Sequence, residues 1–224
     1  MTDGTQRASR TDRRVPATGI LWIAGAVVAL LLACLVDRPA AQWLFDHRGN
    51  PTAKFLAGCL WPLGSGTLQA SVIALLTLVG LALRRHRIAR IGTLLFLTLV
   101  IAAVLTSGLK RVVRRPRPQH MDQPRPTMSV QMHSGEWHSF PSGDVLASCA
   151  LALVLWHMLD RAPRHAWLLA WPVLVSVQRL AAARHFPSDV VSGLVLGFCV
   201  YVAIVSAARR VAHAGARRDR ANPG

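Results

Sequence analysis

Six long apolar segments, separated by short polar stretches, dominate the pattern of hydrophobic and polar positions along the chain. Each has about the ~17 to 25 residues that an α-helix needs to cross a bilayer. A large soluble helical bundle would need a polar face on each helix, and several of these segments have almost none. The sequence therefore predicts an all-α fold, a six-transmembrane-helix bundle. The predicted spans are Ala17–Val36, Thr67–Leu83, Ile91–Leu109, Asp144–Leu159, Trp167 to about Ala183, and Val190–Ala208.

The chain shows no internal repeat and no low-complexity linker, so we expect one domain over residues 17–208. A basic tail, residues 1–16, precedes this domain and is expected to be disordered. A second basic tail, residues 209–224, follows it, with disorder expected from Ala214. Residues 37–66 join the first two apolar segments and carry aromatic side chains among polar ones. This composition favours either a segment lying at the membrane interface or a plain connecting loop.

Basic residues greatly outnumber acidic ones, and their positions along the chain indicate the topology. The sequence has 26 Lys and Arg against 10 Asp and Glu, a formal net charge of +16. Fifteen of the 26 lie in the two tails and in the loops after the second and fourth apolar segments. By the positive-inside rule, these parts face the cytoplasm. We expect a multi-pass protein of a bacterial-type inner membrane, with both termini cytoplasmic. Anionic membrane lipids account for the basic tails, so no nucleic-acid partner is expected.

A cluster of six cations in residues 110–125 breaks this rule, because it falls on the predicted periplasmic side. If the third helix continues past Lys110, Pro116 ends it, and Arg117 then lies between two prolines. Arginine offers forked donors and lysine a point charge, and together they suit an oxyanion with several oxygens. Lipid headgroups are the alternative ligand for such a patch.

Two further clusters lie on the same predicted face. Ser142 and Gly143 place backbone amides and a hydroxyl at the start of the fourth apolar segment, where a helix N-terminus attracts anions, although a plain N-cap fits equally well. His185 and Asp189 are four residues apart and can meet across one helical turn. A carboxylate on one imidazole nitrogen leaves the other free as a nucleophile or base. The three clusters together predict an anion-binding active site at the periplasmic membrane face.

With these residues the sequence resembles the type 2 phosphatidic acid phosphatase superfamily of lipid phosphate phosphatases, which is related in its active site to the vanadium haloperoxidases. The family signature consists of K-x6-RP, PSGH and SR-x5-H-x3-D, and all its spacings are present. The six-span layout also looks like that of the family, so the resemblance covers about residues 17–208. The matching residues are Lys110, Arg117, Pro118, Pro141, Ser142, Gly143, Arg179, His185 and Asp189.

The resemblance implies an integral-membrane phosphohydrolase that acts on a phospholipid, isoprenoid or glycolipid phosphate or diphosphate. It implies that His185 attacks phosphorus and forms a phosphohistidine, and that Asp189 orients the ring by holding its other nitrogen. It also implies that no metal or cofactor is needed. A lipid phosphotransferase is one alternative, and a non-catalytic anion-binding membrane protein is another. The groups that the resemblance assigns to the phosphate oxygens are Lys110, Arg117, Arg179 and the backbone of Ser142 and Gly143.

The sequence departs from the family signature at two positions. Gln178 replaces a serine, which is a minor change, and Asp144 replaces the histidine that protonates the leaving group. General acid catalysis typically contributes about 10² to 10⁴ in rate, and a carboxylate among arginines is a poor acid. Three interpretations stay open: Asp144 caps the helix and pairs with Arg184 or Arg114; it is an acid once a phosphoryl dianion is bound; or the leaving group is itself a phosphate and needs no acid. Two loop histidines are possible substitute donors, His133 and His138.

Overall fold

The computed structural model describes residues 17–124, 127–128 and 135–221, and these residues form helices and turns without any β-strand. The predicted all-α class is confirmed. The tail of residues 1–16 and the candidate donor His133 lie outside the described residues. The α-helices are α1 (Ala17–His47), α2 (Pro51–Cys59), α3 (Trp61–Gly64), α4 (Gly66–Ala82), α5 (His86–Val113), α7 (Gly143–Met158), α8 (Ala170–Ala181) and α9 (Pro187–Ala221). Three short 3-10 helices are η1 (Pro118–His120), η2 (Gly135–Trp137) and η3 (Pro163–Leu169).

Within the described residues, three helical stretches are long and apolar enough to cross a membrane: Gly25–His47, His86–His120 and Pro187–Val211. The helices α4 and α7 are apolar but shorter. The predicted fifth span differs most from expectation, because its first residues belong to the 3-10 helix η3 and only 12 residues form α8. Helix length and composition therefore support a membrane protein, while the count of six spans stays a prediction.

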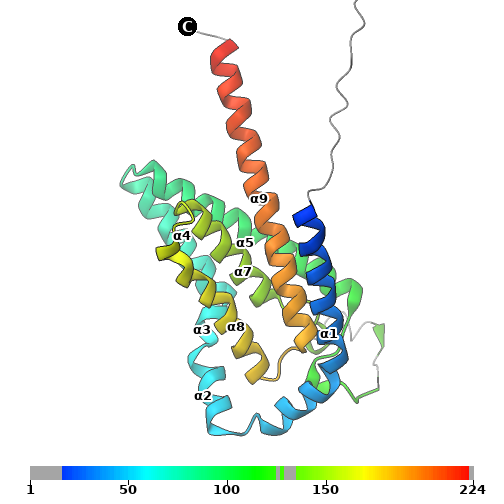
Figure 1. Cartoon of the computed structure of the whole chain (residues 1–224). Helices are drawn as coiled ribbons and strands as arrows, with labels where there is room; N and C mark the ends of the chain where they lie inside the picture. Colours follow the sequence, from blue (N-terminus) through cyan, green and yellow to red (C-terminus); the bar gives the residue numbers. More distant parts are fainter. Residues whose placement is uncertain (1–16, 125–126, 129–134, 222–224) are drawn as a thin grey trace, which may run out of the picture.

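Helix α7 forms the centre of the bundle (Figure 1), where it packs against α9, α5 and α8. Nine of its 16 residues are buried. Glycines at one face of α9 allow close packing: a Cβ on Gly193 would lie 2.8 Å from the Ser142 carbonyl oxygen, and one on Gly197 would lie 2.7 Å from the Leu146 carbonyl oxygen. Small residues four apart let two helix backbones approach in this way. The packing holds the start of α7 beside the start of α9.

The segment predicted as a loop over residues 37–66 is largely helical. Helix α1 continues beyond the predicted end of the first span to His47, and α2 and α3 follow it around one end of the bundle (Figure 1). Asn50 caps α2, because its side chain accepts a hydrogen bond of 2.9 Å from the Thr52 amide. Helix α1 lies beside α9, and α2 and α3 lie against α8. These helices bring the N-terminal part of the chain to the predicted site.

Helix α9 continues past the predicted end of the sixth span at Ala208 and ends at Ala221. Its last turns project beyond the rest of the bundle (Figure 1). This differs from the expectation of disorder after residue 213. Alanine and arginine, which dominate residues 207–221, are among the best helix formers, so the helix can continue even where its residues are strongly basic.

Candidate active site

His185 lies in the turn between α8 and α9 and is only 3% exposed. Its Nδ1 atom is 2.8 Å from the carbonyl oxygen of Ser139. A carbonyl oxygen can only accept a hydrogen bond, so Nδ1 carries the proton and Nε2 keeps its lone pair. Asp189, in the first turn of α9, has its Oδ2 atom 3.6 Å from Nδ1. The ring is therefore oriented by the Ser139 carbonyl, and Asp189 acts on it through charge rather than through the direct hydrogen bond that the sequence suggested.

Asp189 is completely buried, and its carboxylate is well supplied with donors. Oδ2 accepts hydrogen bonds from the Ser139 hydroxyl at 2.5 Å and the Phe186 amide at 2.9 Å. Oδ1 accepts one from Arg115 Nη1 at 2.7 Å. Such partners are what make a buried carboxylate tolerable. The structure thus brings the predicted pair of His185 and Asp189 together, but as parts of a larger hydrogen-bonded network.

The electrostatic surroundings of His185 keep its ring neutral. Burial is the largest effect and lowers the pKa of His185. The carboxylate of Asp189 opposes this change, and the charges of Arg117 and Lys110 add to it. A neutral ring with an unprotonated Nε2 is the form that can act as a nucleophile.

Three arginines, Arg117, Arg179 and Arg184, line a polar pocket of about 650 Å³ between α8, the α2–α3 segment and the loop after α5. The first two are residues that the sequence predicted for phosphate binding, and Arg184 is an addition. Arg117 is held in place by a hydrogen bond of 2.8 Å from its Nε to the Gly135 carbonyl oxygen. Guanidinium groups gathered in one pocket are suited to an anion with several oxygens.

The start of α7 contributes a second set of donors, although one predicted donor is occupied. The Ser142 amide donates to the Asp189 carbonyl oxygen at 3.0 Å. The Ser142 hydroxyl is buried and has no hydrogen-bond partner within the described part of the chain. Gly143 begins the helix, and the first amides of a helix have no earlier carbonyl to reach. A Cβ at Gly143 would lie 2.8 Å from the Thr106 Cγ2 atom, which explains the glycine.

Asp144 forms an ion pair with Arg179, with 2.5 Å between Oδ2 and Nη2. The sequence suggested Arg184 or Arg114 as its partner, and the structure corrects this. Arg114 ends α5, and its side chain donates back to the Arg111 carbonyl oxygen at 2.8 Å. The pairing means that one of the predicted phosphate ligands, Arg179, is shared between Asp144 and any bound phosphate.

His138, a candidate substitute donor, lies under the influence of the same cations. Its Nε2 atom is buried and makes no hydrogen bond to any of the described residues. Burial lowers the pKa of His138, and the charges of Lys110, Arg117 and Arg111 lower it further. His138 is therefore neutral at neutral pH, and only a charge that offsets these cations, such as that of an anion, would favour its protonated form. Lys110 itself is half-buried near the end of α5.

Four residues of the network were not predicted: Ser139, Arg115, Asp37 and Ser188, the last of which donates to Asp37. Ser139 was missed because it acts partly through its backbone carbonyl, which no side-chain pattern reveals. Arg115 lies in the basic cluster, but its side chain contacts carboxylates rather than the pocket. Asp37 could have been noticed as one of only 10 acidic residues, placed directly after an apolar segment. It is 5% exposed and pairs with Arg115, with 2.6 Å between Oδ2 and Nη2.

Comparison with known proteins agrees with this site. The family model described as PAP2 superfamily matches residues 91–212, more than half of the chain and the part that holds the histidine, the arginines and the start of α7. The chain belongs to the PAP2 superfamily. This confirms the resemblance that the three motifs indicated.

Curated relatives of this PAP2 protein are phosphatases. Decaprenylphosphoryl-5-phosphoribose phosphatase of Mycobacterium tuberculosis is 30% identical over 179 residues, covering 78% of this chain and 85% of the relative. Lipid A 1-phosphatase of Rhizobium johnstonii is 32% identical over 121 residues, covering 52% and 48%. Undecaprenyl-diphosphatase of Sulfolobus acidocaldarius is 33% identical over 119 residues, covering 50% and 52%. No solved structure is significantly similar to the chain.

Proposed function

We propose that this chain, a lipid phosphatase of the PAP2 superfamily, transfers the phosphoryl group of its substrate first to His185 and then to water. The Nε2 lone pair attacks phosphorus, the bond from phosphorus to the leaving oxygen breaks, and that oxygen leaves with the electron pair. Water then attacks the phosphohistidine, releases inorganic phosphate and restores the neutral ring. Asp189 stabilises the positive charge that the ring carries in between.

The observation that carries this proposal is the fixed tautomer of His185 close to a cluster of cations. The Ser139 carbonyl holds the proton on Nδ1, and the charges of Lys110 and Arg117 are near enough to lower the pKa of His185. A phosphoryl group held by Arg117, Arg179, Lys110 and the first amides of α7 would meet an unprotonated nitrogen. Cations preorganised in this way stabilise the charge of a transferring phosphoryl group.

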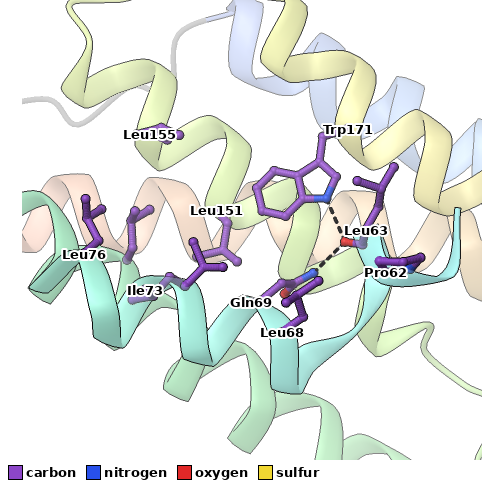
Figure 2. A pocket seen from close by; sticks show the side chains of 11 residues that line it. Pro62, Leu63, Leu68, Gln69, Ile73, Leu76, Leu151, Leu155 and Trp171 are labelled. Carbon is purple, nitrogen blue, oxygen red and sulfur yellow. Dashed lines mark hydrogen bonds between the residues drawn. The ribbon is translucent and has the colours of Figure 1, made fainter.

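An apolar groove that borders helix α3, as the arginine pocket does, supports a lipid as the rest of the substrate. Its cavity volume is about 290 Å³, and its walls are mostly apolar side chains of α3, α4, α5, α7 and α8, with Gln69 as a polar exception (Figure 2). The groove and the pocket both border helix α3, since Trp61 lines the pocket and its neighbour Pro62 lines the groove. The Leu63 carbonyl oxygen accepts hydrogen bonds from Trp171 Nε1 at 2.8 Å and Gln69 Nε2 at 3.0 Å, which holds this junction together (Figure 2). We infer that the phosphate occupies the pocket and the chain of the lipid lies in the groove.

Filling the groove should weaken binding of long lipids selectively. Val72 lines it from α4, so Val72→Trp should exclude about two methylenes of the chain. At about 0.8 kcal/mol per buried methylene, the KM for a long-chain substrate should rise about tenfold, while a short-chain substrate should be little affected. Leu75→Trp is the matched control, because Leu75 lies on the same helix, is similarly exposed and does not line the groove. Equal effects of the two variants on the long-chain substrate would contradict this assignment.

The proposed topology has six spans, cytoplasmic termini and a periplasmic active site in a bacterial-type inner membrane. The distribution of basic residues supports it. Reporter fusions within residues 84–90 and after Ala212 should behave as cytoplasmic, and a fusion near Met128 as periplasmic. Cytoplasmic behaviour at Met128 would put the active site on the wrong face and contradict this topology.

Phosphate release from defined lipid phosphates and diphosphates, measured with purified protein in EDTA, tests the proposed function. A hydrolase that needs no metal and no cofactor releases inorganic phosphate under these conditions. Turnover only after addition of an acceptor lipid would instead identify a phosphotransferase. A protein that binds these lipids and releases no phosphate would be a non-catalytic anion-binding protein, and the proposal would be rejected.

A further inference from the structure

A chain of charges made of two buried carboxylates and the partly buried Arg115 joins helix α1 to the catalytic pair. Arg115 donates from Nη1 to Asp189 Oδ1 at 2.7 Å and from Nη2 to Asp37 Oδ2 at 2.6 Å. Asp37 also accepts a hydrogen bond of 2.9 Å from the Ser188 amide and a further one from the Ser188 hydroxyl. The guanidinium of Arg115 in addition stacks over the Phe186 ring at 4.0 Å. Asp37 and Asp189 are thus held on opposite sides of one cation.

The net charge of Asp189, Arg115 and Asp37 determines the electrostatic field at His185. Asp189 alone facing Arg115 would form a neutral pair, and the field of its carboxylate at the imidazole would be largely cancelled. Asp37 supplies a second carboxylate to the same guanidinium, so the three groups together carry one net negative charge. Buried charges interact strongly and are poorly screened. This net charge matches the positive charge that His185 acquires when it becomes phosphorylated.

We propose that Asp37 and Arg115 are positioning residues for the reaction, and that Asp37 balances Arg115 so that Asp189 keeps its charge for His185. Helix α1 is then part of the active site and not only a membrane anchor. Asp37 lies outside the residues matched by the family model, 91–212, so the catalytic core extends beyond them. The inference rests on the proposed function of His185, but it concerns different residues.

Replacing Asp37 by asparagine tests this role. Asp37→Asn keeps the size of the side chain and removes its charge, so kcat should fall about 10²-fold, the cost typical of a misplaced reacting group. KM should change little, because the arginines of the pocket are untouched. The matched control is Asp46→Asn, which removes an exposed acid from the same helix and should leave both constants unchanged.

The pH profile separates a charge effect from a purely structural one. His185 must be neutral to attack, so kcat/KM is lost as the pH falls through the pKa of the free enzyme's His185. Without the Asp37 charge the imidazolium is less stabilised, and this acid limb should move to lower pH in Asp37→Asn. The ionisation of the substrate is common to both proteins and cancels in the comparison. The charged groups that act on His185 directly are Asp189 on α9, Lys110 on α5 and Arg117 after α5. Asp144, Arg179 and Arg184 act on Lys110 or Arg117, Arg115 binds Asp189, and the titratable His138 feels the same two cations, Lys110 and Arg117.

Two further variants keep the test decisive if Asp37→Asn accumulates poorly. Ser188→Ala removes a hydroxyl between Asp37 and Arg115 but no charge, so kcat should fall several-fold with the acid limb unchanged. The double variant Asp37→Asn/Arg115→Gln restores one net negative charge, so its acid limb should return towards the wild-type position. An Asp37→Asn enzyme, or failing that a Ser188→Ala enzyme, with the kcat of Asp46→Asn would overturn the inference. Wild type and His185→Ala measured alongside report separately on the proposed function.

Discussion

His185→Ala is expected to abolish turnover while the protein still inserts and folds. The ring is proposed to form the bond to phosphorus, and the Ser139 groups in contact with its surroundings cannot take its place: the Ser139 hydroxyl donates to Asp189 and the Ser139 carbonyl accepts from His185. Loss of a nucleophile in a hydrolase costs up to about 10⁶ in kcat, so we expect a loss of at least about 10⁴-fold. The measurement is phosphate release per enzyme at saturating lipid substrate.

Folding must be measured with the same preparation, because His185 is buried. Removing its ring leaves the Ser139 carbonyl without its donor, at a cost of about 1 to 3 kcal/mol, which the bundle should tolerate. His185→Gln is a useful companion, since its amide nitrogen can donate to the same carbonyl while lacking a nucleophilic nitrogen. A folded His185→Gln protein with near-normal turnover would contradict the covalent mechanism.

The wild-type enzyme is expected to cleave lipid diphosphates at least about 10²-fold better than lipid phosphate monoesters. Expelling an alkoxide needs a proton, and a missing general acid costs about 10² to 10⁴ in rate. Expelling a phosphate needs little help, because its second pKa is about 6. Asp144 stands where the family has its acid, and its carboxylate is engaged with Arg179. The measurement is kcat/KM for both substrate classes with the same lipid chain.

Variants of Asp144 should separate the two reactions. Asp144→Asn should cost the diphosphate reaction less than tenfold, since it breaks the ion pair and leaves Arg179 fully available to phosphate. Asp144→His should raise monoester cleavage selectively, because an imidazolium can donate a proton near neutral pH. An equal and large loss on both substrates in Asp144→Asn would instead identify Asp144 as a working acid or an indispensable cap. The leaving-group explanation would then be abandoned.

The curated relatives include a protein named as a phosphatase and a protein named as a diphosphatase. One is a decaprenylphosphoryl-5-phosphoribose phosphatase and another an undecaprenyl-diphosphatase. If monoesters were cleaved as well as diphosphates, His138 would become the first candidate for the missing acid, because its Nε2 has no partner among the described residues and the ring is close enough to feel the charges of Lys110 and Arg117, which are proposed to bind phosphate. His138→Ala would then remove the monoester reaction alone.

The helical class and most of the site could be predicted because both depend on short-range patterns. Apolar length indicates a membrane helix, and the spacing of His185 and Asp189 within one turn survives in the structure. Where the prediction was incomplete, the contacts are long-range. Asp37 and Ser188 are 151 positions apart in the sequence, so no local pattern could pair them. The roles of Arg115 and Arg117 could not be distinguished from the sequence, because both lie in the same basic cluster. The fold places Arg115 against carboxylates and Arg117 in the pocket.

The helices within residues 37–66, which were predicted as an interfacial or connecting segment, show a second limit of prediction from the sequence. Residues 51–64 are short helices rather than an irregular connection, because a capping asparagine and prolines in first-turn positions favour helix starts. The aromatic residues of this segment do not indicate which helices it packs against. Ala57, Gly58 and Trp61 of this segment line the arginine pocket, and a Cβ added to Gly64 would lie 3.2 Å from Arg179 Nη2.

The most direct test of the covalent mechanism is to trap the phosphoenzyme. Enzyme mixed with a lipid diphosphate carrying a radiolabelled terminal phosphate should acquire label within one turnover, and quenching in alkali should preserve it, because phosphohistidine is stable to base and labile to acid. We predict that the label is lost in acid, maps to the peptide containing His185, and is absent in His185→Ala. Label on another residue, or full turnover without any labelled enzyme in the first turnover, would contradict the account.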